Sequence, residues 1–200
     1  MQGETTAETV LVVGVGNDLL SDEGFGVHVA RSLLSREAGP PSHVSVLEAG
    51  TALLDVLSDL TQYSHVVIVD VMSCGRDPGT LYCTEVTPEL VRTPAPSPAL
   101  SLHEWSLLET LHAAVTLGLF PKRLTLLGAE PDNLEPGTDL SPRLATARDK
   151  LVDMLRDGVL AGQAAGYPGF APSFGANPGF SRSGAPMVIP HLRRRLTTGN

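Results

Sequence analysis

Two short apolar runs most constrain the fold of this chain. VLVVGV (Val10–Val15) and HVVIVDV (His65–Val71) are apolar almost throughout, which is typical of central strands buried on both faces of a parallel sheet. Further strands are expected at His43–Gly50 and Arg123–Ala129. A strand at residues 80–86 follows the His65–Val71 strand too soon for a crossover helix, so we expect it to be antiparallel or at an edge.

Helical patterns separate these strands. They cover residues 23–35, 51–60, 101–118 and 141–160. The third begins with Ser101-Leu102-His103-Glu104, a capping-box pattern, and the fourth with Ser141-Pro142, an N-cap residue followed by proline. Residues 87–97 are proline-rich and are expected to form a loop. The order of elements predicts an α/β fold with a mostly parallel sheet between helices.

The 200 residues suit one domain with additional length at the ends. We expect a flexible N-terminus at residues 1–9, a folded domain at 10–160, and a disordered Gly/Pro-rich, Arg-bearing tail at 161–200. The residues before Gly162 carry a net charge of −12 and the remainder +4, and so acidic a body argues against nucleic-acid binding. No apolar run approaches the ~20 residues that span a bilayer. With no secretory signal pattern and only two cysteines, the expected location is cytoplasmic.

Acidic and imidazole side chains are predicted where sites form in such sheets, at the carboxyl ends of the strands. Carboxylates and imidazole suit a borderline divalent ion such as Ni²⁺ or Zn²⁺. Taken singly, each residue also has an ordinary structural interpretation, as a helix first-turn acid, a turn cap or a surface residue. Their predicted convergence at one edge favours a metal site. The residues are Asp18, Asp22 and Glu23 after the first strand, then Glu48, Asp70 and His103.

Other chemistries fit less well. Gly14-x-Gly16 invites a dinucleotide-binding interpretation, but Leu19 stands where the third glycine is needed, and acids lie where a pyrophosphate would bind. Cys74 and Cys83 lack C-x-x-C spacing. We expect Cys83 in the core, whereas a ligand or nucleophile role for Cys74 stays open.

The segment VLVVGVGNDLLSDEGFGVHV resembles the opening of the hydrogenase maturation endopeptidases of the HyaD/HybD/HycI kind. The resemblance covers about residues 10–158. Its most specific parts are the pattern G-x-G-N-x-L-x-x-D-E-G-x-G and the S-x-H-E helix start. It continues through LEAGT (47–51), VVIVDV (66–71), PGTLY (78–82), SLHEWSLLETL (101–111) and LLGAEPDNLEPGTDLSP (126–142).

The resemblance implies a twisted, five-stranded, phosphorylase/hydrolase-like α/β fold. It implies an endopeptidase that removes the C-terminal extension of a [NiFe]-hydrogenase large-subunit precursor after nickel insertion. The family's metal-contacting residues fall on Glu23, Asp70 and His103, which are also the candidate catalytic residues of an aspartyl-type protease. Glu48 occupies a position where relatives carry Asp before Gly-Gly-Thr, and Ala49 replaces the first of those glycines.

The resemblance further implies a monomer that acts on a precursor already holding nickel. Because Glu23, Asp70 and His103 form an incomplete shell, we expect the free enzyme to be metal-poor. Two alternatives remain at this stage. One is a non-catalytic metal-sensing or chaperone module on the same fold. The other is a small-molecule hydrolase or nucleotide-binding α/β domain.

Overall fold

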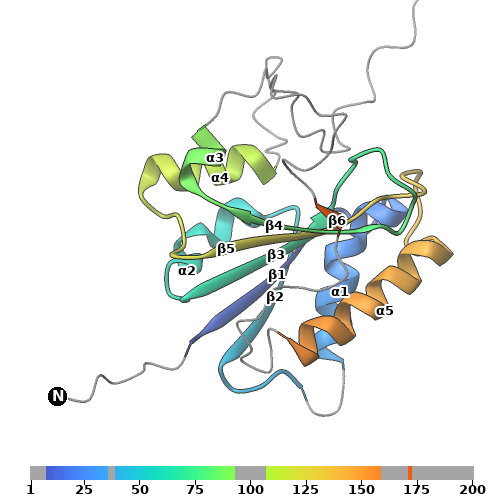
Figure 1. The fold of residues 1–200 in the computed structure, drawn as a ribbon, viewed down its shortest axis with the longest axis horizontal. Coiled ribbons are helices and arrows are strands. Elements are labelled where there is room, and N and C mark those ends of the chain that lie inside the picture. Colours follow the sequence, from blue (N-terminus) through green and yellow to red (C-terminus); the bar gives the residue numbers. More distant parts are fainter. Residues whose placement is uncertain (1–7, 36–38, 93–106, 159–170, 173–200) are drawn as a thin grey trace, which may run out of the picture.

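A mostly parallel sheet with helices on both faces forms the body of the molecule (Figure 1). The computed structural model describes residues 8–35, 39–92, 107–158 and 171–172. Four strands run parallel and occupy neighbouring positions in the order β2-β1-β3-β5. These are β1 (Val10–Val15), β2 (Val44–Gly50), β3 (His65–Val71) and β5 (Leu124–Ala129). The expected mostly parallel α/β sheet is confirmed.

The remaining strands lie beyond β5. β4 (Leu81–Val86) pairs antiparallel with β5, as its short distance from β3 in the sequence predicts. On its other side, the two-residue β6 (Ala171–Pro172) pairs with Tyr82 and Cys83. The five longer strands therefore match the expected sheet, and β6 adds a short pairing from the tail sequence.

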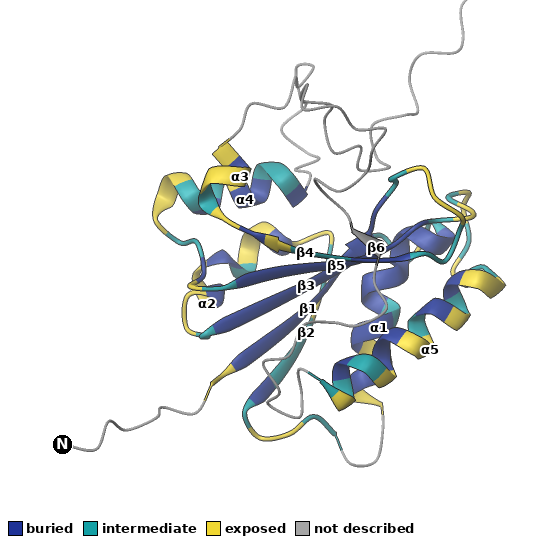
Figure 2. Cartoon of the chain, viewed as in Figure 1, coloured by how far each residue is buried: buried dark blue, intermediate teal, exposed yellow. Residues whose placement is uncertain are grey.

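Helices cover the two faces of the sheet around separate apolar clusters. α1 (Phe25–Leu34) and α5 (Pro142–Asp157) pack on one face. The other face is covered by the 3₁₀ helix η2 (Leu53–Val56), α2 (Leu57–Leu60), α3 (Pro88–Arg92) and α4 (Leu107–Leu117). β1, β3 and β5 are buried along their whole length (Figure 2), which explains why they read as unbroken apolar runs.

Local signals account for the helix boundaries. Ser141 caps α5 as predicted, its Oγ accepting a hydrogen bond from Leu144 N at 3.4 Å. The helix expected over residues 51–60 is divided into η2 and the single turn α2. The predicted start of α4 at Ser101 lies outside the described residues.

The prediction of a loop over residues 87–97 is wrong at its start, where α3 forms. Thr87 precedes Pro88 just as Ser141 precedes Pro142, and Thr87 Oγ1 accepts a hydrogen bond from Leu90 N at 3.3 Å. Val91 is buried in the apolar cluster. A cap and one buried side chain are enough to hold this single turn. Among the described residues, no helix is both long and apolar enough to cross a membrane.

Candidate functional site at the carboxyl edge of the sheet

Asp70 is the penultimate residue of β3 and lies at the carboxyl edge of the sheet. Its carboxylate is almost completely buried, with 1% of the residue exposed, and Oδ1 accepts a hydrogen bond from Val71 N at 2.7 Å. Side chains alternate along a strand, so Asp70 points to the same face as Val66 and Ile68. That face carries the apolar cluster that includes Leu107 of α4.

Glu23 reaches the same edge from the segment between β1 and α1. It lies in the 3₁₀ helix η1 (Ser21–Gly24) and is 7% exposed. η1 and the start of α1 approach the strand ends very closely, since a Cβ on Gly26 would lie 2.0 Å from the carbonyl oxygen of Val69. Two carboxylates that are far apart in the sequence are therefore buried near the ends of β1 and β3, where burial requires polar or charged partners.

Asp22 has a structural role that its sequence pattern did not reveal. Its carboxylate is fully buried and accepts three hydrogen bonds from backbone amides beyond β5. Oδ2 accepts from Asp132 N at 2.9 Å and Asn133 N at 2.7 Å, and Oδ1 accepts from Ser141 N at 2.7 Å. Asp22 thus holds the β5–α5 connection against η1.

Glu130 is a fourth buried acid of this edge, and it is not among the candidates predicted from the sequence. Its carboxylate accepts hydrogen bonds from Tyr82 Oη at 2.5 Å, Cys74 N at 2.8 Å and Gly75 N at 3.2 Å. Glu130 directly follows β5, so the strand-end rule that selected Asp70 applies to it equally. It ties the β3–β4 connection to β4 and β5.

Burial and Glu130 together determine the state of the nearby phenol and thiol groups. Burial, and then the hydrogen bond to Glu130, raise the pKa of Tyr82. Burial, and then the charge of Glu130, raise the pKa of Cys74. Cys74 is therefore a thiol at neutral pH, which disfavours the nucleophile role left open for it. Burial also raises the pKa of Cys83 to about 11, and Cys83 packs against the apolar core as expected.

Glu48 and Asp18 are engaged by a single cation. Arg31 Nε and one terminal nitrogen donate to the two oxygens of Glu48 at 2.9 and 2.6 Å. The same terminal nitrogen donates to Asp18 Oδ2 at 2.8 Å. These bonds, that to Glu48 first, raise the pKa of Arg31. Asp18 and Glu48 therefore anchor the loop after β1 and the end of β2 to α1.

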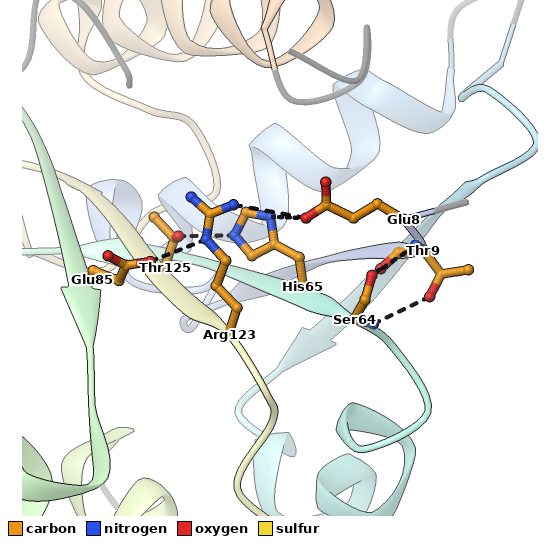
Figure 3. Close-up of polar contacts among 7 residues, drawn as sticks. All are labelled: Glu8, Thr9, Ser64, His65, Glu85, Arg123 and Thr125. Atoms are coloured by element: carbon orange, nitrogen blue, oxygen red, sulfur yellow. Dashed lines mark hydrogen bonds and ion pairs between the residues drawn. The ribbon is translucent and has the colours of Figure 1, made fainter. Parts of the chain in front are cut away.

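A separate polar cluster lies at the opposite, amino edge of the sheet (Figure 3). His65 Nε2 lies 2.9 Å from Thr125 Oγ1, and Nδ1 lies 3.9 Å from Glu8 Oε1. Arg123 approaches Glu8 at 3.7 Å and donates to Glu85 at 3.0 Å. Burial, and then the charge of Arg123, lower the pKa of His65. The cluster pairs strand ends far from Asp70, so His65 lies outside the candidate site.

The structure describes two of the three predicted metal contacts. Glu23 and Asp70 come to the same edge, whereas His103 lies outside the described residues. Within the described part of the chain, no three His, Cys, Asp or Glu side chains are grouped so as to hold a metal ion. The three-residue site of Glu23, Asp70 and His103 stays a prediction.

Comparison with known proteins agrees with this fold. The family model described as hydrogenase maturation protease matches residues 27–157. The chain is 38% identical over 136 residues to the hydrogenase 2 maturation protease of Escherichia coli K12, spanning 66% of this chain and 79% of that protein. It is 33% identical to the hydrogenase expression/formation protein HupD of Rhizobium leguminosarum, spanning 66% of this chain and 64% of HupD.

Solved structures give the same result. The hydrogenase maturating endopeptidase HybD from E. coli superposes with a TM-score of 0.58 at 33% identity, covering 74% of this chain and 93% of HybD. A hydrogenase 2 maturation peptidase from Thaumarchaeota archaeon SCGC_AB-539-E09 superposes with a TM-score of 0.57 at 31% identity. The match covers 76% of this chain and 98% of that peptidase.

The fold and its sequence relatives define the chain as a peptidase. More particularly, it belongs to the hydrogenase maturation protease family, as its resemblance predicts. This result favours a protease over both the non-catalytic module and the nucleotide-binding domain.

Proposed function

We propose that this peptidase removes the C-terminal extension of a [NiFe]-hydrogenase large-subunit precursor after nickel has been inserted. Glu23, Asp70 and His103 contact that nickel. One observation carries the proposal: the carboxylates of Glu23 and Asp70 are both buried at the carboxyl edge, although they come from different segments.

The donor set explains why the metal belongs to the precursor. Two carboxylates and one imidazole form an incomplete shell for a borderline ion, and cysteine thiolates of the precursor are suitable further ligands. Both acids are buried, and a nearby cation stabilises a buried carboxylate. A nickel-loaded precursor supplies that cation, while an empty precursor does not, and this difference is the basis of specificity.

Two routes to hydrolysis are compatible with such a site. In the first, nickel held by Glu23, Asp70 and His103 would supply Lewis-acid chemistry to the scissile carbonyl or to the attacking water. In the second, the carboxylate of Asp70 or Glu23 accepts the proton of the attacking water, and nickel serves for recognition alone. Binding and cleavage by Asp70→Asn help to separate the two routes. If Asp70 is the base of the second route, this variant still binds the loaded precursor but cleaves it slowly.

The test compares nickel-loaded and nickel-free precursor, with cleavage followed as loss of intact mass. Wild type is expected to trim only the loaded form. Glu23→Gln, Asp70→Asn and His103→Ala are expected to lose cleavage at least about a hundredfold. Asp157→Asn is the matched control, because Asp157 is an exposed acid at the far end of α5. This variant should cleave the loaded precursor as wild type does. Equal trimming of empty precursor, or normal cleavage by His103→Ala, contradicts the proposal.

A further inference from the structure

A dense set of hydrogen bonds joins residues 19–22 to the connection between β5 and α5. We call this contact between residues 19–22 and 132–141 the clasp. Ser21 N donates to Gly137 O at 2.7 Å, and Gly137 N donates to Leu19 O at 3.0 Å. Asp22 N donates to Asn133 O at 3.1 Å, and Ser21 Oγ donates to Glu135 O at 2.8 Å. The three bonds to the Asp22 carboxylate complete it.

The clasp holds a strained backbone. Ser21 has φ = +50°, and among the described residues it is the one non-glycine residue with positive φ. This conformation is unfavourable for a residue with a Cβ and persists only where the surroundings impose it. In Ser21 both the amide and the hydroxyl are held by the clasp. The strain lies two residues before Glu23.

Gly137 brings the two segments into contact. A Cβ at this position would lie 2.6 Å from Ser21 Oγ. A larger residue at 137 therefore has to displace the Ser21 side chain or open the clasp. The close approach links one residue of the β5–α5 connection directly to the turn that carries Glu23.

We propose that the clasp positions Glu23 for cleavage, so that Asp22 and Gly137 are positioning residues of the enzyme. The inference rests on the proposed function. Asp22 is held through both its amide and its carboxylate, which fixes where the chain leaves residue 22 and hence where the Glu23 side chain begins. Cleavage requires such groups to be placed to within a fraction of an ångström.

A pair of substitutions separates positioning from simple stabilisation. Gly137→Ala displaces the Ser21 hydroxyl from Glu135 O or separates the two segments of the clasp. Either change loosens the clasp, and kcat/KM for the nickel-loaded precursor is expected to fall about tenfold or more. Ser21→Gly removes the Oγ that the new methyl group would meet, and glycine accepts positive φ, so this variant is expected to stay within about threefold of wild type. The double variant is expected to recover to within about threefold of Ser21→Gly, since the two changes share one contact.

Val152→Ala is the control for stability. Val152 is buried in α5 and its truncation weakens the core without touching the clasp. With all variants assayed well below their Tm values, Val152→Ala should retain wild-type kcat/KM. If kcat/KM falls in Val152→Ala as far as in Gly137→Ala at equal loss of Tm, the clasp is only structural and the inference is wrong.

Amide hydrogen exchange supplies a measurement independent of activity. The amides of Asp22, Asp132, Asn133 and Ser141 should exchange faster in Gly137→Ala and return toward wild-type protection in the double variant. The inference is wrong if Gly137→Ala exchanges these amides faster but cleaves as wild type does, or if its exchange is unchanged. It is also wrong if the double variant recovers neither amide protection nor cleavage. If wild type itself does not cleave loaded precursor, the proposed function fails as well. If wild type cleaves and Gly137→Ala does too, the inference alone fails.

Discussion

Replacing Gly26 with alanine is a sharp test of how the candidate site is assembled. Gly26 is the second residue of α1 and follows Glu23 by three positions. A Cβ at this position would lie 2.0 Å from Val69 O, 2.4 Å from Val15 O and 2.7 Å from Val15 N. All three are backbone atoms at the ends of β1 and β3, so no side-chain rotation can make room. α1 and η1 must move away from the strands, and Glu23 must move away from Asp70.

Two opposing effects determine the size of the loss. In an open helix, glycine to alanine stabilises by roughly 0.5–1 kcal/mol. Insertion of a methyl group into a filled interior costs about 1–3 kcal/mol, and the upper end applies where only backbone can yield. The collision therefore outweighs the gain, and we expect the free energy of unfolding to fall by about 2 kcal/mol or more. For a domain of this size, that corresponds to a Tm about 4–8 °C lower.

Urea unfolding followed by circular dichroism measures this loss. The control is Gly118→Ala, in which the same methyl group has nothing within 4 Å but φ is +71°. That variant should lose only about 1 kcal/mol, from backbone strain. Cleavage of nickel-loaded precursor should fall in Gly26→Ala and stay normal in Gly118→Ala. A Gly26→Ala protein as stable as Gly118→Ala would refute the close packing of α1 on the strand ends.

Three further predictions concern other parts of the molecule. The pKa of His65 is lowered on folding, so as pH falls the unfolded chain binds a proton at this residue before the folded chain does. The contribution of His65 to the free energy of unfolding should therefore be full above about pH 6.5 and decline as pH falls. Urea unfolding across about pH 5–7.5 should show that the free energy of unfolding depends less on pH in His65→Gln. Tyr82→Phe removes a donor from the buried Glu130 carboxylate and should cost about 1–3 kcal/mol in chemical unfolding; a loss within error would mean that water replaces the hydroxyl. Arg31→Met removes a largely exposed ion pair with Glu48, so it should cost no more than about 1 kcal/mol at low salt and less at 1 M salt.

The sheet could be predicted because burial on both faces leaves a direct record in the sequence. Val10–Val15 and His65–Val71 are buried at every position, and no amphipathic pattern competes with that interpretation. The proline content of residues 87–97 favours a loop and hides the α3 turn. In Thr87-Pro88 the proline instead occupies the first turn of a helix, where its missing N–H costs nothing.

The candidate site was only partly predictable. The rule that ligands bind at the carboxyl ends of strands predicts Glu23 and Asp70, but together with Asp18, Asp22 and Glu48. Only the family resemblance separates Glu23 and Asp70 from the other acids. The rule does not reveal that Asp22 binds amides 110 to 119 residues away, because those bonds depend on the path of the β5–α5 connection. Glu130 was within reach of the same rule, since it follows β5 as directly as Asp70 ends β3.

The acids at the carboxyl edge have different tasks, and this affects how substitutions there should be interpreted. Asp22 secures the β5–α5 connection and Glu130 the β3–β4 connection, while Arg31 joins Glu48 to α1. Each holds a segment that borders the candidate site, so neutralising it moves that segment and lowers activity indirectly. Loss of cleavage therefore does not by itself identify a nickel contact at this edge. The distinguishing result is a variant that loses cleavage while its Tm and its amide exchange at the clasp stay those of wild type, and we expect that result from Glu23→Gln but not from a substitution of Asp22.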